Sequence, residues 1–199
     1  MVSRIFLEEN KIEKYKQEYA ETGCVFLPGF LEKNTLQNLL NKIEKNTFQT
    51  RLEGGEDNKF GKVLALPREN VTVFLFTAVL NDPGVFKSIR DITDCGPIGN
   101  FVGRIHRSNA GEDHEIGWHT DTSDNRLLAV TLSLGTDRYS GAKLEIRERV
   151  SKKMIREFGQ LEAGDAVIFK IDPQLEHRLS VLESGRRTVG VGWFRSPEI

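Results

Sequence analysis

His119, Asp121 and His177 are the side chains in this sequence best suited to hold a metal ion together. They read H-x-D, a long gap and then H, and Arg187 follows ten residues after the second histidine. Two imidazoles and a carboxylate on one face of a metal, with the other positions open, are the ligands of mononuclear non-haem iron sites. An arginine nearby would bind a carboxylate through two parallel hydrogen bonds and would stay charged at any working pH.

A strand would place the first two ligands correctly. Side chains two residues apart on a β-strand point to the same face, so His119 and Asp121 can reach one ion while Thr120 points away. The third ligand must then come from another strand. The motif is short and could also occur in a polar surface turn, so its weight depends on the downstream pattern.

The segment around His177 can supply that strand. Gly164-Asp165 is a turn signal, Ala166 to Phe169 is an apolar run, and His177 follows a bend at Asp172-Pro173. After a second turn signal at residues 183–185, the chain resumes through Arg187 toward Phe194. This pattern predicts a hairpin that pairs the His177 strand with the Arg187 strand, so that both side chains line one pocket.

At this point the sequence resembles the 2-oxoglutarate- and Fe(II)-dependent oxygenases, in the branch of prolyl-hydroxylase-like and phytanoyl-CoA-hydroxylase-like enzymes. The resemblance covers residues 98 to 195 well, and the N-terminal half matches more loosely through Tyr19 to Leu31. The segments that carry it are Trp118 to Asp121, Gly141 to Ile146, Ala163 to Phe169, and His177 through Arg187 to Trp193-Phe194.

The resemblance implies a mainly β fold with flanking α-helices and a double-stranded β-helix core, which is a cupin-like jelly-roll. It implies a single oxygenase domain over residues 1–199. In that domain a helical and mixed N-terminal part, residues 1–95, packs on the roll, and residues 98–195 form the jelly-roll core with the metal site.

The resemblance also implies roles for individual residues. His119, Asp121 and His177 fall on the catalytic iron ligands, and Arg187 falls on the residue that holds the distal carboxylate of 2-oxoglutarate. Arg186 is its neighbour on the opposite face of the strand, and the Gly-x-Arg spacing favours Arg187. Candidate contacts to the substrate or to 2-oxoglutarate are Arg104, His106, Trp118, Asn125 and Arg126.

The implied cofactor is Fe(2+), with 2-oxoglutarate and O2 as co-substrates and ascorbate as a candidate stimulant. Relatives that halogenate have lost the carboxylate ligand, so Asp121 favours hydroxylation or a related C–H oxidation. We expect the substrate to be a small molecule such as an amino acid or a natural-product intermediate. Two alternatives stay open: hydroxylation of a residue in a peptide or protein, and a non-catalytic jelly-roll that binds a metal or ligand.

Composition agrees with a compact enzyme. The chain has 199 residues, with 28 basic and 29 acidic side chains and a formal net charge of −1, which gives no global attraction to nucleic acid or to an acidic membrane surface. Its two cysteines have no disulfide-like spacing, which suits a reducing compartment. The N-terminus turns charged too soon for a signal peptide, so we expect a cytoplasmic protein.

The N-terminal half predicts helices separated by short connections. The hydrophobic pattern indicates helices from about Leu7 to Glu21, Thr35 to Lys45 and Val85 to Thr93, and a strand from Cys24 to Leu27. Val71 to Leu80 is apolar and ambiguous between strand and helix. Residues 47–61 are polar and contain glycine, so we expect a mobile loop that either closes over substrate or is an ordinary surface excursion.

Overall fold

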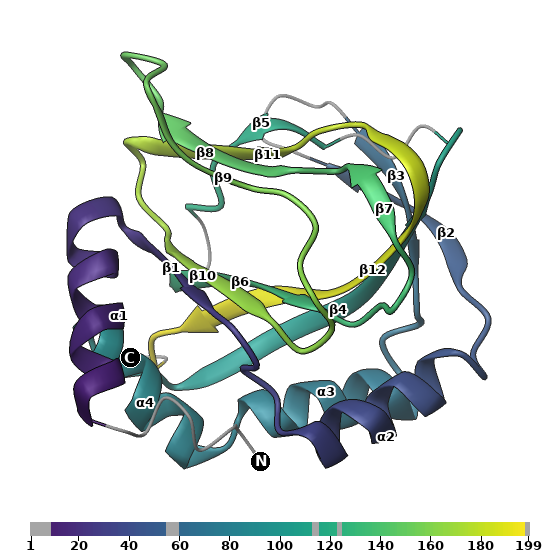
Figure 1. Cartoon of the computed structure of the whole chain (residues 1–199), viewed down its shortest axis with the longest axis horizontal. Coiled ribbons are helices and arrows are strands. Elements are labelled where there is room, and N and C mark those ends of the chain that lie inside the picture. The colour runs from purple at the N-terminus through teal and green to yellow at the C-terminus, as the bar shows by residue number, and fades with distance from the viewer. Residues whose placement is uncertain (1–8, 55–59, 113–115, 123–124, 198–199) are drawn as a thin grey trace.

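Two antiparallel sheets that face each other form the centre of the molecule (Figure 1). The computed structural model describes residues 9–54, 60–112, 116–122 and 125–197. The larger sheet contains, in spatial order, β1 (Cys24–Leu27), β10 (Ala166–Lys170), β6 (Arg126–Ser133), β12 (Leu182–Arg195), β4 (Asn100–Asn109), β3 (Phe60–Ala65) and β2 (Gln49–Gly54), with β7 (Tyr139–Gly141) paired to β12. The smaller sheet contains β5 (Ile116–His119), β11 (Leu175–Leu179), β8 (Leu144–Glu148) and β9 (Met154–Phe158). This is the jelly-roll that the sequence predicts.

Four helices of the described chain cover the larger sheet on the side away from the smaller one (Figure 1). They are α1 (Glu9–Thr22), α2 (Lys33–Ile43), α3 (Val71–Leu80) and α4 (Pro83–Thr93). The starts of α3 and α4 follow from local chemistry, because the side chains of Asn70 and Asp82 accept hydrogen bonds from free backbone N–H groups of the first turn. None of these helices combines the length and the hydropathy needed to cross a bilayer.

Strands β6 and β10 are buried on both faces, which explains their nearly continuous apolar sequences. Alternate side chains, such as Val130 and Ile168, pack into the main core beneath the helices. The residues between them, such as Ala129 and Phe169, face the smaller sheet and join a second apolar cluster. On the side of the larger sheet, the space between the two sheets is therefore lined by strands that are packed on both faces.

Strand β12 lies close to α3 because it carries glycine where a side chain would collide. A Cβ atom at Gly190 would lie 2.5 Å from Cζ of Phe76, a ring that also packs edge-on against Phe101 with centroids 5.6 Å apart. Glycine in a strand interior often marks such a close approach. Helix α3 therefore packs directly against β12, the strand that carries Arg187.

The prediction of a hairpin between the His177 and Arg187 strands is wrong. Strand β11 pairs with β5 and β8, whereas β12 pairs with β4, β6 and β7, so the two strands lie in different sheets. Figure 1 shows the chain leaving β11, curving around the end of the roll and returning in the larger sheet. Gly185, with a φ of 77°, lies in this crossing, where Leu182 to Gly185 pair with β7. The glycine turn therefore changes sheets instead of reversing the strand.

The predicted loop at 47–61 is also wrong over much of its length. Residues 49–54 and 60–65 form the antiparallel strands β2 and β3, and residues 55–59 lie outside the described part of the chain. A polar, glycine-containing sequence favours a loop, but pairing to β4 through β3 places these residues in the sheet. The three predicted helices are present as α1, α2 and α4 with shifted ends, residues 7 and 8 being outside the described chain, and the ambiguous segment is α3.

Candidate metal centre

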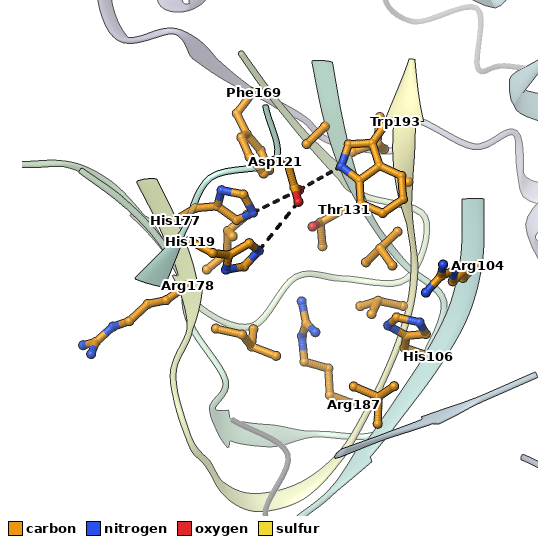
Figure 2. A pocket seen from close by; sticks show the side chains of 18 of the residues that line it. Arg104, His106, His119, Asp121, Thr131, Phe169, His177, Arg178, Arg187 and Trp193 are labelled. Carbon is orange, nitrogen blue, oxygen red and sulfur yellow. Dashed lines mark hydrogen bonds and ion pairs between the residues drawn. The ribbon is translucent and has the colours of Figure 1, made fainter. Parts of the chain in front are cut away.

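His119 and His177 face each other from neighbouring strands of the smaller sheet. They are direct partners in the register of β5 and β11, and their ring centroids are 4.2 Å apart. Because directly opposite residues share a face, both imidazoles point into the space between the sheets (Figure 2). The ring of Phe169, across that space on β10, packs against His177 with centroids 4.8 Å apart.

Asp121 completes a triad with the two histidines. One carboxylate oxygen, Oδ2, lies 3.4 Å from Nε2 of His177, and the other, Oδ1, lies 3.9 Å from Nε2 of His119. The three ligand atoms lie within 4.8 Å of one another. The sequence prediction put Asp121 on the same strand as His119, but β5 ends at His119 and Asp121 occupies the following loop. The two side chains converge although only one belongs to a strand.

The pKa shifts of Asp121 and His177 favour the protonation states that metal binding requires. Burial by itself would raise the pKa of Asp121, but the hydrogen bond and charge of His177, the Trp193 indole and the charge of His119 outweigh it and hold that pKa at about 2. Burial lowers the pKa of His177, which favours the neutral imidazole. An ionised carboxylate and neutral imidazoles are the metal-binding forms.

The tautomer of His119 also follows from a neighbour. Its Nδ1 lies 2.8 Å from the carbonyl oxygen of Gly117. A carbonyl only accepts hydrogen bonds, so Nδ1 carries a proton, and in the neutral ring the lone pair is on Nε2, on the side of Asp121. The donor set of two imidazole nitrogens and one carboxylate therefore fits an iron(II) ion.

Arg187 lies in the same cavity, on β12 opposite the triad. Arg187 is only 7% exposed and pairs in register with Ser108 of β4. Its guanidinium points into the cavity (Figure 2). Burial lowers the pKa of this guanidinium, and the Tyr139 hydroxyl, which accepts a hydrogen bond from it, opposes that shift. Within the described part of the chain, its Nε has no hydrogen-bond partner. A buried cation with an unsatisfied N–H is an evident place for a carboxylate ligand.

The triad and Arg187 line one cavity of about 380 Å³ between the sheets. Of the five candidate contacts predicted from sequence, Arg104, His106 and Arg126 line it. Trp118 and Asn125 are not among its described lining residues: the Trp118 ring stacks on Arg147, and the Asn125 carbonyl accepts from the backbone of Ser196. The structure thus brings together the three predicted iron ligands, Arg187 and three of the five other candidate contacts.

Sequence reasoning missed two side chains that contact this site. Trp193 donates from Nε1 to Oδ2 of Asp121 over 2.8 Å, and Tyr139 contacts Arg187. Trp193 could have been found, since strand alternation places it six residues from Arg187 on the same face. Tyr139 could not have been found from the sequence, because the pairing of its strand, β7, with β12 is a tertiary contact that no local pattern predicts.

Comparison with known proteins agrees with this geometry. Residues 103–195 match the family model described as the 2OG-Fe(II) oxygenase superfamily, and this segment contains the triad and Arg187. The resemblance inferred from the motifs is therefore confirmed over this segment. Enzymes of this family use Fe(II), 2-oxoglutarate and O2. Among curated proteins, no sequence matches this chain significantly.

Solved structures of several oxygenases share the fold. An oxidoreductase of the 2OG-Fe(II) oxygenase family from Burkholderia pseudomallei has a TM-score of 0.73 at 14% identity, covering 94% of this chain and 92% of that one. A prolyl hydroxylase from Trichoplax adhaerens, in complex with a hypoxia inducible factor peptide fragment, has a TM-score of 0.68 at 11% identity, with 96% and 92% covered. The alpha ketoglutarate dependent epimerase SnoN from nogalamycin biosynthesis has a TM-score of 0.67 at 11% identity, with 95% and 82% covered. At these identities the likeness establishes the jelly-roll and says nothing of the substrate.

Proposed function

We propose that His119, Asp121 and His177 hold Fe(II), that Arg187 binds the distal carboxylate of 2-oxoglutarate, and that the enzyme hydroxylates or similarly oxidises a C–H bond of a small molecule. The observation that carries the proposal is the placement of the triad and a buried, incompletely hydrogen-bonded arginine in one cavity. When bound, the iron would supply the activation of O2 that drives decarboxylation of 2-oxoglutarate to succinate and CO2.

The chain's own residues supply binding and orientation. Arg187 presents a guanidinium in a nearly dry site, where a charge-assisted pair with a carboxylate is stronger than in water. The ligand's carboxylate would also satisfy the Nε that the protein leaves unpaired. The Phe169 ring beside His177, together with Val189 and Val191 on β12, lines the cavity with apolar surface that excludes water from the reacting atoms.

The charge of the cavity favours an acidic substrate. The described lining residues include four arginines, Arg104, Arg126, Arg178 and Arg187, and one carboxylate, Asp121. Arg178 points away from the triad (Figure 2) and pairs with Glu145 at 2.6 Å, so its charge is neutralised outside the cavity. Iron would add two positive charges and 2-oxoglutarate two negative ones, so among the described lining residues the three arginines Arg104, Arg126 and Arg187 would still outnumber the single carboxylate of Asp121. A substrate with a carboxylate or phosphate group would be attracted by this field.

Succinate formation tests the proposal. The purified chain would be incubated with Fe(II), ascorbate and 2-oxoglutarate, alone and with matched pairs of small acids and their neutral amides. We expect succinate that requires Fe(II) and is stimulated by acids more than by amides, with Asp121→Ala inactive. Absence of succinate from the wild type under all conditions, together with equal iron binding by Asp121→Ala, would leave a non-catalytic ligand-binding jelly-roll as the function.

Hydroxylation of a peptide is the second candidate, and the hairpin of β2 and β3 favours it. Strand β3 pairs with β4 beside the cavity, and Val63 of β3 is one of the lining residues. The hairpin therefore continues the cavity wall toward the molecular surface, where an extended chain could lie. The same assay with proline-containing peptides in place of free acids distinguishes the two candidates, because a peptide oxygenase would form succinate only with the peptides.

A further inference from the structure

Asp121 is the one member of the triad that no strand pairing positions. His119 and His177 are fixed by the register of β5 and β11, whereas Asp121 lies in the loop beyond β5. A carboxylate side chain in a loop has two rotatable bonds, and ordering them on metal binding would cost affinity. Some other contact must orient this carboxylate before the metal arrives.

Two side chains of the larger sheet make that contact. Trp193, near the end of β12, donates its indole N–H to Oδ2 of Asp121 over 2.8 Å. Arg126, the first residue of β6, donates from Nη1 to Oδ1 over 3.2 Å. The guanidinium carbon of Arg126 lies 3.8 Å from the centroid of the Trp193 ring, so the two donors also support each other by stacking.

We propose that Arg126 and Trp193 act as a positioning pair that holds the Asp121 carboxylate in its metal-binding orientation. The inference rests on the metal site proposed above. One donor on each carboxylate oxygen opposes rotation about the terminal bond, and both donors come from strands whose places in the larger sheet are fixed. Hydrogen bonds to a metal-binding carboxylate commonly change metal affinity tenfold to a hundredfold.

The chain offers a matched control in its other tryptophan. Trp118 directly precedes His119, yet its ring lies 3.6 Å from the guanidinium of Arg147 and 4.8 Å from that of Arg178. It is a cation-stacked indole of the same kind, next to a triad residue in sequence. Its replacement removes an indole without touching Asp121.

Calorimetric titration of the whole chain with Co(II), in the absence of 2-oxoglutarate, tests the pair. We expect Trp193→Phe to weaken Co(II) binding by about tenfold to a hundredfold, because the ring remains and only the N–H is lost. Arg126→Gln should weaken it as well, and Arg126→Lys should recover part of the loss. Trp118→Phe should bind within about twofold of the wild type. The double variant Trp193→Phe/Arg126→Gln should lose less than the sum of the two single effects, because the residues act as one unit.

The visible absorption of bound Co(II) separates positioning from general damage. At saturating Co(II), Trp193→Phe should show an altered ligand-field band, since a loosely held carboxylate changes the coordination, whereas Trp118→Phe should keep the wild-type band. Arg126 is at the edge of the cavity, so its variants test the proposal even if Trp193→Phe fails to fold. Wild-type affinity and spectrum in folded Arg126→Gln or Trp193→Phe would overturn the positioning pair. If the wild type itself does not bind Co(II), the proposed metal site fails instead.

Discussion

The two ends of the cavity differ in how their charges are satisfied. At the triad, Asp121 has the indole of Trp193, the guanidinium of Arg126 and the imidazole of His177 within 3.4 Å. At the opposite end, Arg187 is 7% exposed and has the Tyr139 hydroxyl as a hydrogen-bond partner, but its Nε has no partner among the described residues. The protein completes the anionic end from its own residues and leaves the cationic end for a ligand to complete.

This contrast matters for binding. A pre-ordered carboxylate reduces the cost of capturing a metal, and an unsatisfied buried guanidinium increases the gain from capturing a carboxylate. The Asp121 end should stabilise the fold even without a metal, whereas the incompletely paired Arg187 should destabilise the ligand-free protein. Variants of Asp121 and of Arg187 should therefore change the free energy of unfolding in opposite directions and change ligand affinity by different amounts.

The largest effect is expected from Asp121→Ala. Removal of a metal-binding residue should cost more than the tenfold to hundredfold typical of residues that only support a ligand, so Fe(II) affinity should fall by more than about a hundredfold. Anaerobic Fe(II) titration measures it, and succinate formation should disappear. Retention of Fe(II) affinity within tenfold would remove Asp121 from the ligand set.

Arg187→Met should weaken 2-oxoglutarate binding by about a hundredfold or more, since two charge-assisted hydrogen bonds of roughly 1.5–3 kcal/mol each are lost. Fe(II) affinity should hardly change. The matched control is Arg186→Met: this neighbour points to the other face and pairs with Asp137 at 2.8 Å. Titration of the metal-loaded protein with 2-oxoglutarate measures both. Equal losses in the two variants would mean that the general charge of the segment, not the position of Arg187, determines affinity.

Asp121→Ala and Arg187→Met should change the stability of the protein without metal or 2-oxoglutarate in opposite directions. Asp121→Ala strips the acceptor from Trp193 and Arg126, so the free energy of unfolding should fall by about 1–2 kcal/mol. Arg187→Met removes a buried, incompletely paired cation and should raise it by about 1 kcal/mol. Urea denaturation without metal or 2-oxoglutarate measures both changes. A clear loss of stability in Arg187→Met would show that the free protein satisfies this cation better than the geometry indicates.

The smallest effect is expected from Tyr139→Phe. This change removes the one hydroxyl that orients Arg187 and keeps the ring, so 2-oxoglutarate affinity should fall by only about two- to tenfold, as for one net hydrogen bond of about 0.5–1.5 kcal/mol. The same titration as for Arg187→Met detects it. An effect as large as that of Arg187→Met would indicate that the hydroxyl contacts the ligand itself.

Much of the site could be predicted from residue types and spacing, and the errors concern connections. The ligand pattern and the arginine could be predicted because imidazole, carboxylate and guanidinium have few alternative uses in that order, and the jelly-roll followed from the family resemblance that these motifs carry. The connection between the His177 and Arg187 strands could not be predicted. A glycine turn has the same sequence pattern whether the chain reverses into a hairpin or crosses to a second sheet. The sequence of residues 47–61 is typical of a loop for a related reason, since β3, which pairs with β2, joins the sheet through β4, far away in sequence.

By itself, the sequence determined the chemistry: two imidazoles, one carboxylate and one arginine, on a chain whose alternating apolar pattern produces sheets. Only the tertiary structure decided which groups support that chemistry. Trp193 and Arg126 meet Asp121, and Tyr139 meets Arg187, because strands distant in sequence lie opposite each other in the roll. The physical reason is that local patterns specify which face of a strand is buried, whereas the partner on the facing sheet depends on the register and crossing of the whole fold.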